Sequence, residues 1–235
     1  MKYLYYFKYF YFIARNWNIK LAAFTVYHEI KGERKYHLDT VKIDRLHHEK
    51  IESANITHAS IYQASSYYLV EKAYKYLEDE KVNYGLVDFG CGKGRVLILA
   101  AYYGFKKITG IDFSRNLVLE AEANIEKVSQ FFPNTVFNVI CDDAVNYKIE
   151  KDKNCFFFFN PFDEVIMLKV IKNILSSLKE DPRKIYVVYI NPLDKEIFLS
   201  AGFEEEWSFK KMEYLEFSIL SKKQETFHSG NGLEE

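Results

Sequence analysis

Residues 87–97 read VDFGCGKGRVL. Three glycines alternate in this stretch, Gly90, Gly92 and Gly94, and an acid, Asp88, comes before them. The residues before the glycines are apolar and those after them have the apolar periodicity of a helix, which predicts a strand, a glycine loop and a helix. Because glycine has no Cβ, a ligand can approach such a loop closely and meet free backbone N–H groups. The stretch therefore predicts a ligand site at the end of a strand.

The alternation of strand and helix continues to the end of the chain. Strands are expected at 84–90, 106–113, 135–141, the beginning of 154–162 and 183–190, and helices at 93–104, 114–132, 163–180 and within 191–203. The last two runs, 204–210 and 213–222, suit an antiparallel hairpin. Unbroken apolar strands alternating with helices are typical of a parallel sheet covered on both faces. The sequence predicts an α/β fold, a doubly wound and mostly parallel seven-stranded sheet with an antiparallel C-terminal hairpin.

An aromatic-rich extension precedes this sheet. It begins MKYLYYFKYFYFIARNW, in which Lys8 and Arg15 share one face of a helix and a broad aromatic face lies opposite. The apolar run is too short to span a bilayer. We expect this helix to pack on the core or on a second subunit of a homodimer, and an interfacial membrane anchor is the alternative. Residues 24–44 are expected to form two short strands around a turn at 31–33.

Three segments follow from these patterns. Residues 1–64 form the N-terminal extension, a helix and a short hairpin that serve as a lid or a packing segment. Residues 65–223 form the α/β domain, whose first helix, 66–80, is capped by Ser65 or Ser66. Residues 224–235 are expected to be a flexible tail.

Charge and cysteine content narrow the function classes. A net charge of -1 at pH 7 makes a nucleic-acid partner less expected. The three cysteines, Cys91, Cys141 and Cys155, are odd in number and form no CxxC pair, so we expect buried inert thiols and a cytoplasmic protein rather than a disulfide framework. No spacing of histidine and cysteine matches a metal site.

A second acid indicates the kind of ligand. Asp112 follows Gly94 by 18 residues and ends the next expected strand, where an acid takes ribose hydroxyls. The glycines do not match the dinucleotide pattern G-x-G-x-x-G/A, because the third glycine comes one residue early. They do not match the phosphate loop either, because Lys93 precedes Gly94. The ligand is therefore expected to carry ribose but not to need a phosphate site.

The acids at the strand ends favour a positively charged ligand. Asp143 follows the third expected strand, so three carboxylates gather at one edge with Asp88 and Asp112. Such a cluster repels a pyrophosphate and suits an ammonium and a sulfonium. Lys93 and Arg95 have the opposite effect, although both could point outward from the start of the helix.

Four motifs in this order, DFGCGKG, IDFS, CDDA and NPF, resemble the motif series of class I methyltransferases, the Rossmann-like, seven-stranded enzymes that depend on S-adenosyl-L-methionine. The resemblance covers roughly residues 60–220. It implies a methyltransferase whose cofactor is S-adenosyl-L-methionine.

The resemblance also implies the cofactor contacts. Asp88 with Gly90, Gly92 and Gly94 holds the methionine end, Asp112 holds the ribose hydroxyls, and Phe113 packs on the adenine. Asp143 accepts from the adenine amino group while Ala144 donates from its backbone, with Asp142 as the alternative to Asp143. Upstream, IYQASSYY resembles a lid segment of lysine-methylating relatives, which gives Tyr62, Gln63 and Ser65 lid or carboxylate-contact roles.

The NPF motif bears on the methyl acceptor. Amine-methylating relatives have [ND]-P-P-[FYW], in which the Asn side-chain oxygen and a backbone carbonyl accept hydrogens from the target nitrogen. Asn160, Pro161 and Phe162 would supply the amide, the carbonyl and the ring that packs on the substrate, a protein lysine or a small-molecule amine. The second proline of the pattern is missing here. The alternative is that Asn160 and Pro161 only cap the helix that begins near Asp163.

Two other functions stay open at this point. One is a cofactor-binding module with little turnover, because the NPF motif is incomplete and no general base is evident beyond Tyr62, Tyr67 or a water. The other is an NAD-dependent oxidoreductase, which the acids and the glycine spacing disfavour.

Overall fold

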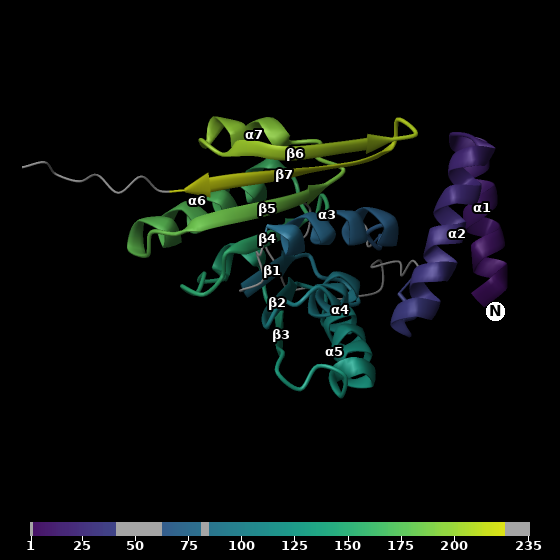
Figure 1. Cartoon of the computed structure of the whole chain (residues 1–235), viewed down its shortest axis with the longest axis horizontal. Coiled ribbons are helices and arrows are strands. Elements are labelled where there is room, and N and C mark those ends of the chain that lie inside the picture. The colour runs from purple at the N-terminus through teal and green to yellow at the C-terminus, as the bar shows by residue number, and fades with distance from the viewer. Residues whose placement is uncertain (1, 41–62, 81–84, 224–235) are drawn as a thin grey trace, which may run out of the picture.

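Seven strands form one sheet in the computed structural model, which describes residues 2–40, 63–80 and 85–223 (Figure 1). The strand order is β3-β2-β1-β4-β5-β7-β6. The strands are β1 Gly85–Phe89, β2 Lys107–Asp112, β3 Val136–Cys141, β4 Cys155–Phe158, β5 Lys184–Ile190, β6 Glu204–Lys211 and β7 Leu215–Lys223. The first five pair in parallel, and β7 pairs antiparallel with both β5 and β6. The predicted sheet is confirmed.

This topology brings the chemistry to one edge of the sheet. The carboxyl ends of the parallel strands lie at the same edge, where ligands bind in open α/β sheets. Ile190, the last residue of β5, pairs with Phe217 near the beginning of β7, so the β6–β7 turn also lies at that edge. In Figure 1 the helix pair α1–α2 stands beyond it.

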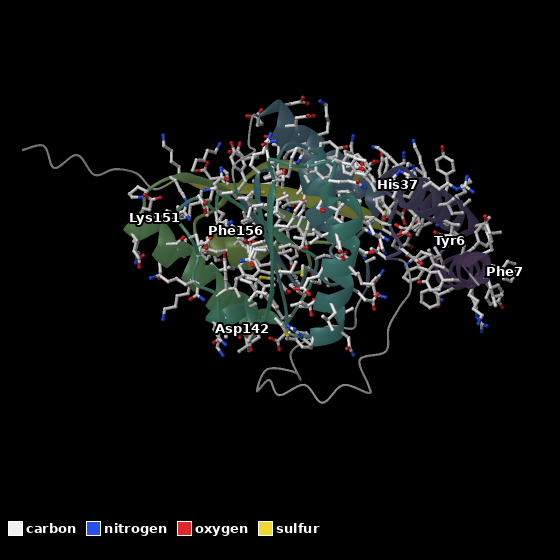
Figure 2. All side chains as sticks on the ribbon, turned by 90° about the horizontal axis from the view of Figure 1, so that it is seen from below. Tyr6, Phe7, His37, Asp142, Lys151 and Phe156 are labelled. Atoms are coloured by element: carbon white, nitrogen blue, oxygen red, sulfur yellow. The ribbon has the colours of Figure 1, made fainter. Side chains whose placement is uncertain are left out.

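Helices cover both faces, because the central strands are apolar on both sides. On one face lie α3 Tyr67–Asp79, α4 Arg95–Tyr102 and α5 Arg115–Ser129, and on the other α6 Glu164–Glu180 and α7 Lys195–Ser200. Adjacent residues of β4 serve the two cores: Phe157 packs with the first group and Phe156 with the second. Figure 2 shows Phe156 inside the sheet layers. The predicted helices in 65–223 are present, with ends shifted by a few residues.

The predicted N-terminal hairpin is wrong. Residues 24–36 belong to a helix, α2 Ile19–Tyr36, which follows α1 Lys2–Asn16 and ends at His37 with φ 56°. The buried stripe of α2 includes Leu21, Glu29 and Glu33, so two acids interrupt the apolar pattern that would have revealed the helix. Gly32 is a packing position and not a turn, because an added Cβ would lie 2.2 Å from Cγ of Tyr67.

The helix α1 packs on α2 through one face and leaves aromatic side chains on the other. Ile13 joins the core, with Tyr9 and Phe10 packed against it, which confirms the prediction that this helix packs on the core. Phe7 is 68% exposed and points outward in Figure 2, and Tyr3 and Tyr11 are exposed as well. Pairing of this surface with a second subunit stays a prediction. Within the described residues, no helix combines the length and the apolar character needed to cross a membrane.

Candidate active site

The glycine loop takes a backbone shape that favours glycine. Gly90, Gly92 and Gly94 have φ values of 83°, 52° and 78°, a region that other residues rarely adopt. The N–H groups of Gly90 and Cys91 donate to the carbonyl of Ile111 at 2.9 and 3.0 Å, which ties the loop to β2. At Gly90 the loop touches the NPF motif, since an added Cβ would lie 2.6 Å from Cβ of Pro161.

Two carboxylates lie buried beside the loop. Asp112 accepts from the N–H of Gly92 and from the N–H of Ser114, each at 2.9 Å, so it fixes both the loop and the start of α5. Burial raises the pKa of Asp88 well above its usual range, and the neighbouring charge of Asp112 raises it further. A pair of buried acids with this electrostatic cost is stabilised by a bound cation.

The acids that follow β3 are engaged locally. Asp143 is the N-cap of a short 3₁₀ helix, Ala144–Asn146, and accepts from the N–H of Val145 at 3.1 Å. Asp142 accepts from its neighbour's N–H and from Nδ2 of Asn146 at 2.9 Å. Both lie next to Asp112, because Asp112 and Cys141 are register partners. The structure therefore does not distinguish Asp143 from Asp142 as the expected partner of the adenine.

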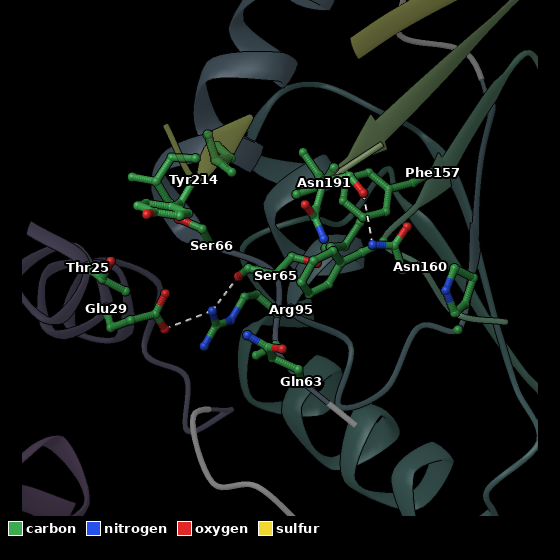
Figure 3. A pocket seen from close by; sticks show the side chains of 18 of the residues that line it. Thr25, Glu29, Gln63, Ser65, Ser66, Arg95, Phe157, Asn160, Asn191 and Tyr214 are labelled. Carbon is green, nitrogen blue, oxygen red and sulfur yellow. Dashed lines mark hydrogen bonds and ion pairs between the residues drawn. The ribbon is translucent and has the colours of Figure 1, made fainter. Parts of the chain in front are cut away.

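The side-chain amide of Asn160 has a hydrogen-bond partner for its nitrogen but none for its oxygen among the described residues. Its φ is 40°, and its Nδ2 donates to the carbonyl of Asn191 at 2.8 Å. A carbonyl can only accept, so the amide nitrogen faces Asn191 and Oδ1 is the remaining atom. Oδ1 is buried and has no hydrogen-bond partner among the described residues. Figure 3 shows Asn160 beside Asn191, joined by this bond.

The other NPF residues divide between the two sides of the sheet. Pro161 lines the cavity with Asn160. Phe162 instead packs edge-on against Phe158, with ring centroids 6.4 Å apart, on the face covered by α6. The alternative that Asn160 and Pro161 cap this helix is wrong, because Asp163 is its N-cap and accepts from the N–H groups of Val165 and Ile166.

A cavity of about 580 Å³ joins Asp88, Gly90, Asp112 and Asn160. Of the other predicted site residues, Gly92, Gly94, Asp142, Asp143, Ala144 and Phe162 are not among those that line it. Its floor contains Asp88, Gly90, Asp112 and Phe113, and its far wall contains residues of α1, α2 and the β6–β7 turn. Gln63 and Ser65 also line it, whereas Tyr62 lies outside the described residues. Such a volume suits a small molecule.

Arg95 enters this cavity from the beginning of α4, which excludes the possibility that it points outward. It is 3% exposed, and its guanidinium pairs with Glu29 at 2.8 Å and with Glu33 at 3.4 Å. It also donates to the hydroxyl of Thr40 and to the carbonyl of Ser65. Figure 3 shows its contacts with Glu29 and Ser65. This network joins α2 to the helix that follows the glycine loop.

Lys93 is also turned inward. It is 2% exposed, and its Nζ lies 3.0 Å from Oε2 of Glu120 on α5. Neither cation is therefore aimed at bulk solvent. Because Arg95 already faces two acids, it does not create the phosphate site that a nicotinamide dinucleotide needs.

Tyr67, one of the candidates for a general base, is built into the same network. Its hydroxyl donates to Glu33 at 2.9 Å and its ring lies 3.9 Å from the Arg95 guanidinium carbon. Burial raises its pKa above the usual range. These contacts give Tyr67 a structural place rather than the role of a base near neutral pH.

Three features of the site escaped the sequence analysis. Asn191 carries the carbonyl that orients Asn160, and its signal was a second Asn–Pro pair directly after a strand. Glu29 lines the cavity from a segment predicted as strand. Trp17 and Tyr214 meet across the cavity with ring centroids 6.2 Å apart, a contact that no local pattern indicates.

Cys91 lines the cavity from the glycine loop, whereas Cys141 and Cys155 do not. Cys91 and Cys155 are buried, as predicted, but Cys141 is exposed, which corrects that expectation. Within the described part of the chain, no cluster of three or more histidine, cysteine or acidic residues could hold a metal ion.

Comparison with known proteins places this site in a family. A methyltransferase-domain family model matches residues 62–217. No curated protein sequence matches the chain.

Three solved structures share the fold at low sequence identity. Magnesium protoporphyrin IX methyltransferase from Synechocystis, solved with bound S-adenosylmethionine, has 14% identity and a TM-score of 0.51 over 68% of this chain and 85% of its own. A putative RNA methyltransferase from Pyrococcus horikoshii has 13% identity and a TM-score of 0.53, over 83% of this chain and 98% of its own. The PH0226 protein of the same organism has 15% identity and a TM-score of 0.52, over 81% of this chain and 99% of its own.

The family match covers the glycine loop, Asp112 and the NPF motif together, and the sheet order agrees with it. The chain therefore belongs to the methyltransferase-domain family, and its resemblance to the class I enzymes that use S-adenosyl-L-methionine is confirmed.

Proposed function

We propose that this protein transfers the methyl group of S-adenosyl-L-methionine to an amine nitrogen. The observation that carries the proposal is the open Oδ1 of Asn160, a buried acceptor at the end of β4 with no partner among the described residues. An amine brings N–H donors, and a buried acceptor without a donor costs roughly 1–3 kcal/mol. A methyl acceptor that presents only oxygen lone pairs to Oδ1 would leave this free-energy cost in place.

The cofactor is expected to lie along the edge formed by β1, β2 and β3. Asp88 and the glycine loop face its methionine end, Asp112 its ribose, and Asp143 or Asp142 its adenine. The buried acids Asp88 and Asp112 suit the positive charges of its ammonium and sulfonium. Gln63 and Ser65 line the cavity near Arg95, in agreement with the carboxylate-contact role expected for them.

The residues of this chain align the acceptor and exclude water. When bound, the cofactor supplies an activated methyl group: a nitrogen–carbon bond forms as the carbon–sulfur bond breaks, and its electron pair stays on sulfur. Asn160 Oδ1 accepts one N–H and so aims the nitrogen lone pair along the displacement. The acceptor ammonium first releases a proton to water, which provides this lone pair, and the methylated nitrogen leaves as an ammonium. Alignment of this kind contributes up to roughly 7–11 kcal/mol in favourable cases.

Pro161 and Phe162 enter the proposal differently. Pro161 contacts Gly90 and lines the cavity, so its carbonyl is the candidate second acceptor beside Asn160. Phe162 packs away from the cavity, and its role in the proposal is to brace the motif against Phe158 rather than to touch the acceptor.

Asn160 variants test the proposal. Asn160→Ala should bind S-adenosylhomocysteine within about twofold of the original protein in calorimetric titration. Transfer from isotopically labelled cofactor into the amine fraction of a cell extract should fall by about 100-fold or more, the scale seen when one aligned polar contact is removed.

Asn173→Ala is the matched control. Asn173 also donates from Nδ2 to a backbone carbonyl at 2.8 Å, that of Val145, and does not line the cavity. It should lose stability without losing transfer. Equal loss of cofactor binding and transfer in Asn160→Ala, or label found only on hydroxyl products, contradicts the proposal.

A further inference from the structure

Resting on the proposed function, we infer that the methyl acceptor is a small cationic molecule with a flat apolar body, enclosed by α1, α2 and the β6–β7 turn. The cavity does not end above the glycine loop. It continues between α2, with Thr25 and Glu29 on one side, and the β6–β7 turn, with Glu213 and Tyr214 on the other (Figure 3). We call this second part of the cavity the acceptor chamber.

The chamber is enclosed by side chains from distant parts of the chain. Trp17, at the junction of α1 and α2, meets Tyr214 edge-on with centroids 6.2 Å apart and an angle of 71° between the rings. Phe12 of α1 meets Trp17 at 5.8 Å and 70°. These three rings form one wall from α1 to the C-terminal hairpin. Because the whole cavity, including the part expected to hold the cofactor, has a volume of about 580 Å³, the space left for the acceptor suits a small molecule.

The lining of the chamber fits a flat apolar group. Rings and aliphatic side chains dominate it, namely Tyr9, Phe12, Ile13, Trp17, Leu21 and Tyr214. Trp17 and Tyr214 are each 45% exposed, so one surface of each is open to a ligand rather than buried in the core. Stacking or edge contact with a planar ligand uses this surface.

The charge around the cavity fits a cation. Its lining contains five carboxylates, Glu29, Asp88, Asp112, Glu213 and Glu216, and one guanidinium, Arg95. That guanidinium is already paired with Glu29 and with Glu33 behind the lining. Glu216 pairs with Lys210 at 3.1 Å, so part of its charge is balanced too. Asp88 and Asp112 are assigned to the charges of the cofactor, so Glu213 of the turn is the carboxylate left to attract an ammonium in the chamber.

The Arg95 network holds α2 in position over the cavity. Glu29 and Glu33 are both on α2, and Arg95 lies directly after the glycine loop. The position of α2, and with it the width of the chamber, is therefore fixed to the cofactor loop by a buried ion pair. This coupling makes α1–α2 a part of the acceptor site rather than a separate appendage.

Three probe molecules of similar size separate the parts of the inference. We would titrate 2-phenylethylamine, 2-phenylethanol and n-butylamine into the protein saturated with S-adenosylhomocysteine, by calorimetry. The first has both the charge and the ring, the second only the ring and the third only the charge. The inference expects the first to bind at least about tenfold more tightly than either of the others, which corresponds to about 1.4 kcal/mol.

Chamber variants test the wall. Tyr214→Ala and Trp17→Ala should weaken 2-phenylethylamine by about fivefold or more and leave S-adenosylhomocysteine unchanged, while Tyr214→Phe keeps the ring and the affinity. Tyr27→Ala is the control, because Tyr27 is 61% exposed on α2 and does not line the cavity. It should change neither affinity.

The outcomes separate this inference from the proposed function. If S-adenosylhomocysteine binds but the neutral alcohol matches the amine, or if Tyr214→Ala and Tyr27→Ala behave alike, the chamber assignment is overturned while methyl transfer stands. Label from the cofactor that enters only protein or RNA fractions overturns it as well. Failure of S-adenosylhomocysteine to bind at all sinks the proposed function instead.

Discussion

Gly90 and Pro161 lie against each other across two motifs that are far apart in the sequence. A Cβ built on Gly90 would approach Cβ of Pro161 to 2.6 Å. Gly90 begins the loop expected to hold the cofactor, and Pro161 follows the amide expected to hold the acceptor. The absence of one side chain therefore sets the spacing between the two halves of the site.

A change of Gly90 to Ala tests this spacing. Both its φ of 83° and the contact with Pro161 oppose a side chain, so we expect a loss of about 2–4 kcal/mol in the free energy of unfolding. Binding of S-adenosylhomocysteine should also fall, because the loop or Pro161 must shift. Denaturant unfolding and calorimetry measure the two effects.

Gly104→Ala separates strain from contact. Gly104 has a similar φ of 89°, but nothing lies within 4 Å of its added Cβ. This variant should lose only the backbone part, about 1–2 kcal/mol, and keep full affinity. Equal losses of stability and affinity in the two variants would mean that Pro161 plays no part.

We predict that the charge of Asp88 lowers the free energy of unfolding but supports cofactor binding. Its pKa is raised by burial and then by Asp112, so the folded state holds its proton more tightly than the unfolded chain does. The free energy of unfolding therefore falls as pH rises from the usual carboxyl pKa, about 4, towards the raised value.

Asp88→Asn removes that buried charge. Near pH 4 the variant and the original protein should have similar melting temperatures, and at pH 7 the variant should melt higher, by about 2–4 °C for each kcal/mol gained. It should nevertheless bind S-adenosylmethionine more weakly than the original protein. A stability difference that does not change between pH 4 and 7 would contradict the assignment of the raised pKa to Asp88.

Asp112 should couple cofactor binding to loop geometry. Asp112→Ala removes the acceptor of two backbone N–H groups, those of Gly92 and Ser114, and the expected ribose contact. We expect S-adenosylhomocysteine affinity to fall by about 100-fold, at about 1.4 kcal/mol per tenfold. The control is Asp163→Ala, which also removes an acceptor of two backbone N–H groups but leaves the loop intact. Comparable affinity losses in both variants would sink the ribose assignment.

Removal of Arg95 should destabilise the protein strongly. Arg95→Met leaves Glu29 and Glu33 buried without their guanidinium, for which a loss of about 3–5 kcal/mol is expected. Lys75→Met breaks pairs with Glu78 and Asp79 that are exposed on α3, and should leave the free energy of unfolding nearly unchanged. Combining Arg95→Met with Glu29→Gln and Glu33→Gln should recover part of the loss. No recovery in urea unfolding would show that packing, not charge, dominates at Arg95.

The sheet and the side of the site expected to hold the cofactor could be predicted from local patterns. Short apolar runs that alternate with helices, such as the one in β4, indicate strands buried on both faces, and parallel strands bring their carboxyl ends to one edge. That rule places the glycine loop beside Asp112. The properties expected of this region, glycine backbone conformation and carboxylate charge, can be read from single residues of the sequence.

The side of the site expected to hold the acceptor depends on contacts between distant segments. The helix α2 was hidden because Glu29 and Glu33 look like surface residues until Arg95, from another part of the chain, meets them in the interior. The bond from Asn160 to Asn191 and the contact of Trp17 with Tyr214 also join segments that no periodicity connects. Hydrophobic patterns record burial of apolar groups, whereas a buried charge or amide is stable only through its distant partner, and that partner is set by packing.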